Sequence, residues 1–385
     1  MGTRRPGIGQ RKSPARYSGA MRILVVSTWY PTHDAPFRTP FITRHVRAIA
    51  RDHDVHVIHV QLLDGSPVTQ ETYDGVAVTR VGFDPRQPLT MVKALAEIRH
   101  WARFSDVVHT MAFSSALISA PVVGRTPWVH TEHWNGVLFP EHVNQLWERT
   151  AWLRHVLRLP RVVTGVSTLM TRKLEEFART GATQLIGNVV DHAPQVAPLP
   201  DDGALRLIGV GAATEHKGAL LAVDTVAWLR EQGHDASLVW DGDGPVRDQA
   251  QQRARERGIG DHVDFRGFRG TEDLWKDLAE STVFVLPSKS ETFCVAAAEA
   301  LAAGRPVIMG DQGGQGDFIT ERNGRMVSER SPEAFGRAVL DLTHDSAAAS
   351  PQEMAREIRA RYGSDAVSDQ LTELYRRAQG GERRR

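Results

Sequence analysis

Hydrophobic and polar positions alternate along the chain in a way that predicts two successive series of strands and helices. Short apolar runs are typical of buried parallel strands, and hydrophobic residues spaced three and four positions apart are typical of amphipathic helices. In the first series, strands are expected at 21–31, 54–60, 106–111, 127–133, 161–167 and 183–190. Helices are expected at 39–50, 91–104, 141–159 and 168–180, the first capped by Thr39 with Pro40 in its first turn.

A proline-rich stretch, 191–203, interrupts this pattern and is expected to be a linker. The second series has strands expected at 205–211, 236–242, 262–267, 282–288 and 305–310. Its helices are expected at 216–233, 245–258, 271–280, 292–304 and 350–378. Because strands and helices alternate on both sides of the linker, we predict two doubly wound α/β domains with a cleft between them.

Composition narrows the class of protein. The 385 residues include 47 basic and 46 acidic side chains, a balance that argues against a dedicated nucleic-acid binder. Cys294 is the only cysteine, so no disulfide forms within the chain and a reducing, cytoplasmic location is expected. No apolar run approaches the roughly 20 residues that span a bilayer. Residues 1–20 and 381–385 are expected to be disordered tails, the first basic enough for weak contact with an anionic membrane face.

Two glutamates in an otherwise apolar segment are the strongest candidates for chemistry. Glu291 follows a predicted strand, and Glu299 lies eight residues later within the predicted helix 292–304. Eight helical residues rise about 12 Å, so the two carboxylates cannot share a metal ion but can bind opposite ends of one elongated ligand. Carboxylates accept hydrogen bonds from vicinal hydroxyls such as those of a ribose or a hexose. For either glutamate alone, a helix-dipole contact or a salt bridge is an equally simple explanation.

Loops at the carboxyl ends of the predicted strands hold further candidates. Lys217 and Gly218 lie at a predicted helix start, where free N–H groups and a lysine together favour phosphate. Gly313 and Gly314 allow the backbone to approach a ligand closely. Combined with the two glutamates, this set of hydroxyl-binding and phosphate-binding groups describes a site for a sugar nucleotide.

Two nearby motifs carry less information. The segment "GVGAAT" at 209–214 lacks the last glycine of the dinucleotide-binding pattern, because Thr214 stands there. The segment "DGDGPV" places Asp241 and Asp243 in an Asp-x-Asp pattern, but a turn rich in glycine and aspartate, followed by a helix that Pro245 opens, is the simpler interpretation. We therefore expect no metal site.

The segment "LPSKSETFCVAAAEALAAGRPVI" resembles the Glu-x7-Glu motif of retaining glycosyltransferase family 4. The segments "GVGAATEHKGALLAVDTV", "GGQGDFITERNGRMV" and "LIGNVVD" resemble other parts of the same family, and the resemblance extends from residue 21 to about residue 380. It implies the GT-B fold: two Rossmann-like domains, an interdomain cleft and a C-terminal crossover helix. The implied divisions are an acceptor domain at 21–190, a linker at 191–202, a nucleotide-sugar domain at 203–355 and a helix at 356–380 that packs back on the first domain.

The resemblance also implies roles for individual residues. Glu291 would contact hydroxyls of the donor sugar, Glu299 the ribose and Lys217 the diphosphate. His133, in preference to His130, would face the donor sugar. The remaining residues that the resemblance places at the donor site are Gly211, Phe268, Gly313, Gly314, Gln315 and Gly316, with the backbone around Phe268 lining the base.

Four features depart from the family pattern. Ala212 stands where an arginine is usual, which removes one cation from the diphosphate site, and Arg38 is the expected substitute. The loop 34–41 lacks the usual paired glycines. Cys294 replaces a frequent glycine and is expected to narrow the sugar pocket, and Val189 replaces the glycine of the family's Asn-Gly-Val-Asp segment.

The resemblance implies metal-independent, retaining transfer of a hexosyl or N-acetylhexosaminyl unit from a nucleotide sugar to a hydroxyl of a glycan, glycolipid or small molecule. Family frequency favours a UDP-sugar, which is a co-substrate, so no bound cofactor is expected. Two alternatives stay open: a nucleotide-sugar epimerase of the same fold, and a non-catalytic subunit that binds sugar nucleotides. Trp29, Tyr30 and Phe37 are candidates for stacking on an acceptor sugar, and for Tyr30 a role in the core is an equally good explanation.

Overall fold

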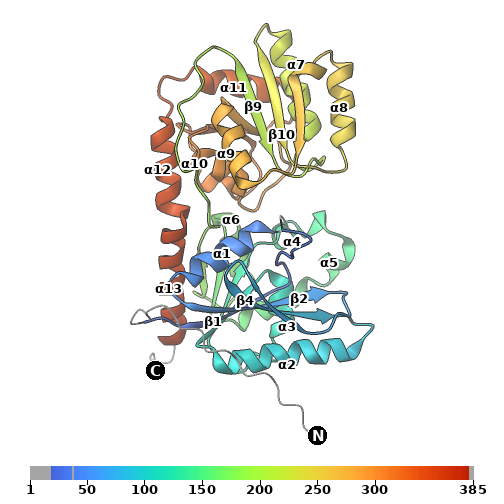
Figure 1. Ribbon diagram of the computed structural model, residues 1–385, viewed down its shortest axis with the longest axis vertical. Coiled ribbons are helices and arrows are strands. Elements are labelled where there is room, and N and C mark those ends of the chain that lie inside the picture. The colour runs from blue at the N-terminus through green and yellow to red at the C-terminus, as the bar shows by residue number, and fades with distance from the viewer. Residues whose placement is uncertain (1–18, 37–38, 381–385) are drawn as a thin grey trace.

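The computed structural model describes residues 19–36 and 39–380, and its strands form two sheets in two stacked domains (Figure 1). The first domain, at the bottom of Figure 1, has an eight-stranded sheet with the order β3-β4-β2-β1-β5-β6-β7-β8. Its strands are β1 (Arg22–Ser27), β2 (Asp54–Leu62), β3 (Thr69–Tyr73), β4 (Val76–Phe83), β5 (Val107–Met111), β6 (Trp128–Glu132), β7 (Val162–Gly165) and β8 (Thr183–Leu185). Neighbouring strands are parallel except β3 and β4, which pair antiparallel.

Helices cover both faces of this sheet and complete two apolar layers. They are α1 (Pro40–Ala50), α2 (Pro88–Phe104), α3 (Phe113–Ser119), α4 (Asn135–Leu138), α5 (Gln145–Arg149) and α6 (Thr168–Glu175). Helix α1 buries Ile42, Val46 and Ile49 in one layer, as the spacing of three and four residues predicts. Pro40 occupies its first turn, but the predicted cap is wrong: Thr39 is left-handed, with φ 49°, and its side chain makes no capping hydrogen bond.

The second domain has a six-stranded parallel sheet with the order β11-β10-β9-β12-β13-β14. The strands are β9 (Leu205–Val210), β10 (Ala236–Asp241), β11 (Val263–Gly267), β12 (Val283–Leu286), β13 (Val307–Gly310) and β14 (Gly324–Val327). Its helices are α7 (Ala219–Glu231), α8 (Arg247–Glu256), α9 (Thr271–Glu280), α10 (Val295–Ala302) and α11 (Pro332–Thr343), with the 3₁₀ turns η3 (Gly260–His262) and η4 (Gly314–Asp317). The strand order reverses between β9 and β12, the position at which open parallel sheets bind ligands.

Two C-terminal helices run along one side of both domains, as Figure 1 shows in red. Helix α12 (Pro351–Tyr362) packs on α10 of the second domain, and α13 (Ser364–Gly380) packs on α1, β5 and β6 of the first. The single helix predicted at 350–378 is therefore wrong, because Gly363 between them is extended, with φ −62° and ψ 157°. The chain crosses back to the first domain at this glycine.

The long helix predicted at 141–159 is also wrong. The structure has three short elements there, η1 (Pro140–His142), α5 and η2 (Ala151–Arg158). The apolar residues do not share one buried face, since Leu146 is 71% exposed and Trp152 is 68% exposed. Without a common packing surface, a continuous helix lacks the tertiary contacts that supply most helix stability.

The apolar pattern does not predict β3, β4 or β14. Polar side chains interrupt β4, where Arg80 is buried and donates to Glu71 and His59. Because these polar residues are buried, a prediction based on hydrophobic runs does not identify the strand β4. Within the described ranges, no helix is long and apolar enough to cross a membrane.

Candidate active site

The two predicted glutamates lie in the loop before α10 and in the middle of α10, at the end of the second sheet that faces the first domain. Strand β12 ends at Leu286, and Glu291 follows in the loop, where it forms a parallel β-bridge with Gly313. Glu299 lies within α10. Both are nearly buried, with 7% of Glu291 and 6% of Glu299 exposed. Carboxylates at such exposures require partners, and the structure supplies a cation to each.

Lys217 pairs with Glu291, and the distance between Lys217 Nζ and Glu291 Oε1 is 2.6 Å. The lysine precedes α7, and Gly218 after it has φ 81°. A Cβ on Gly218 would lie 2.3 Å from the Pro287 carbonyl oxygen, so only glycine lets the two loops meet. Burial is the largest single influence and lowers the pKa of Lys217, but the charge of Glu291, its hydrogen bond and a contribution from Cys294 together outweigh burial and raise that pKa above its ordinary value. The lysine is therefore a permanent cation beside a helix N-terminus, which suits a phosphate.

The glycine-rich loop, residues 311–318, packs against the backbone of Glu291. Gly313 has φ 136°, and a Cβ there would lie 2.1 Å from the Glu291 carbonyl oxygen. The Gly314 amide donates to that same oxygen at 3.0 Å. The Gln315 side chain is fully buried and donates from Nε2 to the Gly310 carbonyl at 2.6 Å. The Gln315 side chain, one of the predicted donor-site groups, thus points into the loop itself. A Cβ on Gly316 would have the Met326 side chain as its neighbour.

This loop also touches the first domain. A Cβ on Gly314 would lie 2.3 Å from the Ser167 Cβ, and Asp317 Oδ2 accepts the Thr168 amide of α6 at 2.6 Å. Asn135 at the start of α4 contacts the segment before α10 through Ser290 and Thr292, each at 3.4 Å. The domains therefore meet directly around the start of α10.

Glu299 pairs with Arg44, a residue that the sequence reading did not single out. Arg44 lies on α1 of the first domain, and its Nη2 is 2.5 Å from Glu299 Oε1. Its Nε is 2.8 Å from Asp191 Oδ2 at the start of the linker. Burial raises the pKa of Glu299 above its ordinary value, while the Arg44 charge works in the opposite direction. The sequence carried no local signal for this contact, because Arg44 and Glu299 are 255 residues apart.

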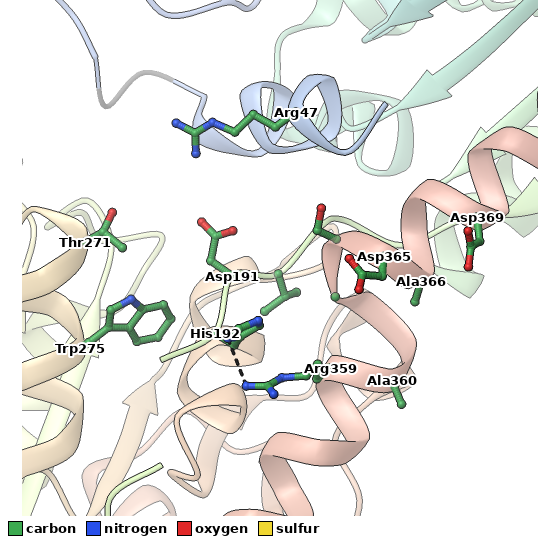
Figure 2. Close-up of a pocket in the computed structure, with 13 residues that line it drawn as sticks. Arg47, Asp191, His192, Thr271, Trp275, Arg359, Ala360, Asp365, Ala366 and Asp369 are labelled. Atoms are coloured by element: carbon green, nitrogen blue, oxygen red, sulfur yellow. Dashed lines mark hydrogen bonds between the residues drawn. The ribbon is translucent and has the colours of Figure 1, made fainter. Parts of the chain in front are cut away.

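A cavity of about 660 Å³ lies between the domains next to this pair (Figure 2). Asp191 belongs to both, since it lines the cavity and binds Arg44. Figure 2 shows Arg47 of α1 across from Thr271 and Trp275 of α9. A hydrogen bond of 3.1 Å joins Arg359 Nη2 and His192 Nδ1 in the same cavity. The full lining is Arg47, Val190, Asp191, His192, Thr271, Trp275, Arg359, Ala360, Gly363, Ser364, Asp365, Ala366 and Asp369.

His133 lies in the first domain after β6, with only 6% of the residue exposed. Its Nδ1 lies 3.1 Å from Asn188 Oδ1, and its ring contacts Phe41 and His45 of α1. Its Nε2 is buried and has no hydrogen-bond partner among the described residues. Burial holds the pKa of His133 well below 6.5, so the ring is neutral. These ring contacts are all with residues of the first domain.

The other predicted residues occupy the loops after the strands. Gly211 follows β9 with φ 142°, and its carbonyl accepts the Trp240 indole N–H at 2.9 Å. Phe268 follows β11 and is 65% exposed. Tyr30 is 1% exposed and belongs to the core of the first domain, so the core role holds for it and the acceptor-stacking role does not. Trp29 packs edge-on against Phe41. Arg38 and Phe37, which the sequence reading proposed, lie outside the described residues.

The Asp-x-Asp segment forms a turn. Asp243 Oδ1 accepts the Gly244 amide at 2.8 Å, and the helix begins at Arg247, two residues after the predicted Pro245. Asp241 is buried, and burial raises its pKa to about 7. Among the residues that the structure describes, no group of three or more His, Cys, Asp or Glu side chains is arranged to hold a metal ion.

Comparisons with known proteins agree with this architecture. The model described as "Glycosyltransferase Family 4" matches residues 41–193, and the model described as "Glycosyl transferases group 1" matches residues 195–361. A glycogen synthase of Mycobacterium tuberculosis is 27% identical, over 94% of this chain and 96% of its own length. A 2-deoxystreptamine glucosyltransferase of Streptomyces kanamyceticus is 28% identical, over 57% of this chain and 63% of its own.

Solved structures share the whole fold. Sucrose-phosphate synthase of Thermosynechococcus elongatus has a TM-score of 0.74 at 22% identity, covering 94% of this chain and all of its own. The Anabaena protein HepE, solved in complex with UDP and glucose, has a TM-score of 0.71 at 17% identity, covering 92% of this chain and 99% of its own. The predicted GT-B fold class is confirmed. The chain belongs to glycosyltransferase family 4, the group 1 glycosyltransferases of the GT-B type.

Proposed function

We propose that this glycosyltransferase transfers a hexosyl or N-acetylhexosaminyl unit from a nucleotide sugar to a hydroxyl of a glycan, glycolipid or small molecule. The transfer retains the anomeric configuration, and a UDP-sugar is the preferred candidate for the donor. The observation that carries the proposal is the arrangement around α10, where Lys217 pairs with Glu291 in the loop before the helix and Glu299 lies within the helix. Two carboxylates and a cation supply hydroxyl acceptors for two sugar rings and a counter-charge for the phosphates between them. The complex of HepE with UDP and glucose supports this choice of donor.

In this proposal, Lys217 stabilises the departing diphosphate. Breaking the bond from the donor sugar leaves negative charge on the phosphate, and a fixed cation in a partly buried site stabilises that charge more than water does. The phosphates would replace Glu291 as the partner of Lys217. Glu291 would then be free to accept hydrogen bonds from hydroxyls of the donor sugar. The N-terminus of α7 adds partial positive charge at the same place.

The glycine-rich loop links donor binding to domain closure. Gly314 and Asp317 of that loop contact the first domain through Ser167 and Thr168. A donor held by the loop would therefore be covered by the first domain, which excludes water and aligns the acceptor. Hydrolysis of the donor would be slow as long as these contacts hold.

The test is a thermal-shift panel of UDP-, GDP- and ADP-sugars followed by transfer assays. A ligand stabilises a protein by RT ln(1 + [L]/Kd), so the true donor should raise the melting temperature most. We expect one nucleotide class to stand out and the matching sugar to be transferred with retention. Conversion of the donor to an epimer without any acceptor would favour the epimerase alternative. Stabilisation without turnover on any acceptor would favour a binding subunit, and no stabilisation at all would overturn the proposal.

A further inference from the structure

Arg44 reaches across the cleft from the first domain to the second. Its guanidinium binds Glu299 at 2.5 Å through Nη2 and Asp191 at 2.8 Å through Nε. The side chains of Arg44 and Glu299 are 11% and 7% exposed. The third nitrogen, Nη1, is buried and has no hydrogen-bond partner among the described residues. The guanidinium is thus enclosed between the domains and fixed by carboxylates on two sides.

Closing the cleft over Glu299 carries an electrostatic cost. In an open molecule, water would solvate this carboxylate, whereas the closed arrangement removes the water and favours the protonated acid. A protonated carboxyl has an O–H donor and loses acceptor capacity, so it holds the two hydroxyls of a ribose less well. Arg44 replaces the water that closure removes. Because each carboxylate oxygen has two lone pairs, the contact with Oε1 still leaves acceptor capacity for hydroxyls.

We propose that Arg44 is a positioning residue for the nucleotide site: from the first domain, it keeps Glu299 ionised and oriented toward the ribose of the donor when the cleft is closed. The inference rests on the proposed ribose-binding role of Glu299. It makes nucleotide affinity depend on closure, since the cation and the carboxylate belong to different domains. The charged groups that act on Glu299 are Arg44, which favours its ionised form, and Asp191, which opposes it.

Titration calorimetry with UDP, GDP and ADP tests this role. One of these nucleoside diphosphates should bind the wild-type protein. We expect Arg44→Met to raise the dissociation constant of that diphosphate at least tenfold at pH 7.5. The ratio of the two dissociation constants should grow toward pH 6, because Glu299 without its cation takes up a proton at higher pH. Arg44→Lys should recover part of the affinity and flatten the pH dependence. A residue that merely supports the fold would not give this pH-dependent ratio.

Arg51 provides a matched control. It lies at the end of the same helix and pairs with Asp365 of α13, which packs on the first domain. Arg51→Met should bind the diphosphate within twofold of the wild type at every pH. If Arg44→Met does not fold, as a thermal melt would reveal, Arg44→Lys and Asp191→Asn carry the test, with Asp191→Asn expected to change affinity because it releases one side of the guanidinium.

A double-mutant cycle separates this proposal from the proposed function. The single variant Glu299→Gln should bind the diphosphate more weakly than the wild type. Adding Arg44→Met to Glu299→Gln should change the affinity less than twofold further, because the arginine acts through the carboxylate. If Arg44→Met binds as tightly as the wild type or more tightly while Glu299→Gln binds weakly, the role of Arg44 is overturned and the ribose-binding role of Glu299 stands. If Glu299→Gln leaves the affinity unchanged, the proposed function of that site fails, and the inference with it.

Discussion

Lys217 Nζ lies 2.6 Å from Glu291 Oε1, so the cation proposed for the diphosphate and the carboxylate proposed for the donor sugar neutralise each other. The two residues come from loops after different strands, β9 and β12, which are neighbours in the sheet. A lone phosphate or a lone sugar would compete with one half of this pair. A sugar nucleotide supplies a partner for both halves, and this favours it over free sugar or free phosphate.

Lys217→Ala should lower turnover at saturating donor by on the order of 100-fold, the usual effect of removing one group that stabilises charge in the transition state. The measurement is the initial rate of transfer with the donor that the thermal-shift panel identifies. Lys276→Ala is the control, because Lys276 belongs to the same domain and its side chain is 69% exposed. Full turnover by the Lys217 variant would contradict its role at the leaving group.

Glu291→Gln should lower the rate of transfer without lowering the affinity for the nucleoside diphosphate, because the diphosphate lacks the donor sugar that Glu291 is proposed to contact. Since Lys217 loses its competing carboxylate in this variant, the diphosphate should bind as tightly as before or more tightly. Calorimetry and initial rates together check this separation of effects. A loss of diphosphate affinity comparable to that of Glu299→Gln would show that the two glutamates do not act on different parts of the donor.

The sequence predicts where most strands lie along the chain and that both glutamates are candidate site residues, because these features depend on local patterns. Runs such as 283–286 are apolar since the strand is buried on both faces, and that burial appears directly in the composition. Glu291 and Glu299 stand out because carboxylates are rare among small apolar neighbours.

Contacts between the domains could not be predicted in this way. Arg44 and Glu299 are 255 residues apart in sequence, and nothing local distinguishes Arg44 from other arginines on an amphipathic helix. Arg80 likewise hides β4, because a buried arginine interrupts the hydrophobic pattern and is compensated by Glu71 on the paired strand. Such residues are recognisable only when the fold brings their partners to them.

Gly314→Ala should impair transfer much more than Gly316→Ala, although both residues belong to the glycine-rich loop. A Cβ on Gly314 would lie 2.2 Å from the Thr292 carbonyl oxygen and 2.3 Å from the Ser167 Cβ, so the loop and the first domain would have to separate. A Cβ on Gly316 would meet only the Met326 side chain, at 3.5 Å. We expect at least a tenfold loss of kcat/KM for the first variant and less than twofold for the second. Equal losses would contradict the proposed link between loop and closure.

Cys294→Gly should be more stable than Cys294→Ala by about 1 kcal/mol, because a left-handed backbone strains every residue except glycine. Cys294 has φ 66° and ψ 77° at the start of α10, and its side chain is buried. Both variants lose the thiol, but only the glycine variant also loses the strain. Urea unfolding of the two variants side by side measures the difference in the free energy of unfolding. Greater stability of the alanine variant would indicate that the backbone strain is negligible.

Buried histidines should make the first domain less stable below neutral pH. Burial lowers the pKa of His45 and His56 to about 4 and holds those of His109 and His133 well below 6.5. The unfolded chain therefore binds protons that the folded chain does not. The contribution of these histidines to stability is complete above pH 6.5 and falls as the pH drops from 6.5 toward 4, by up to about 1.4 kcal/mol per pH unit for each group.

Removing one such histidine tests the sign and the size of this effect. His109 bonds Tyr375 and Thr131 in the core of the first domain, while His344, at the end of α11, is exposed. Between pH 7.5 and pH 5, His109→Asn should lose less of its free energy of unfolding than the wild type, by up to about 2 kcal/mol, because one proton uptake by the unfolded state is gone. His344→Asn should follow the wild type. Urea unfolding at the two pH values measures both, and an unchanged loss in the His109 variant would mean that this ring does not stay neutral in the folded protein.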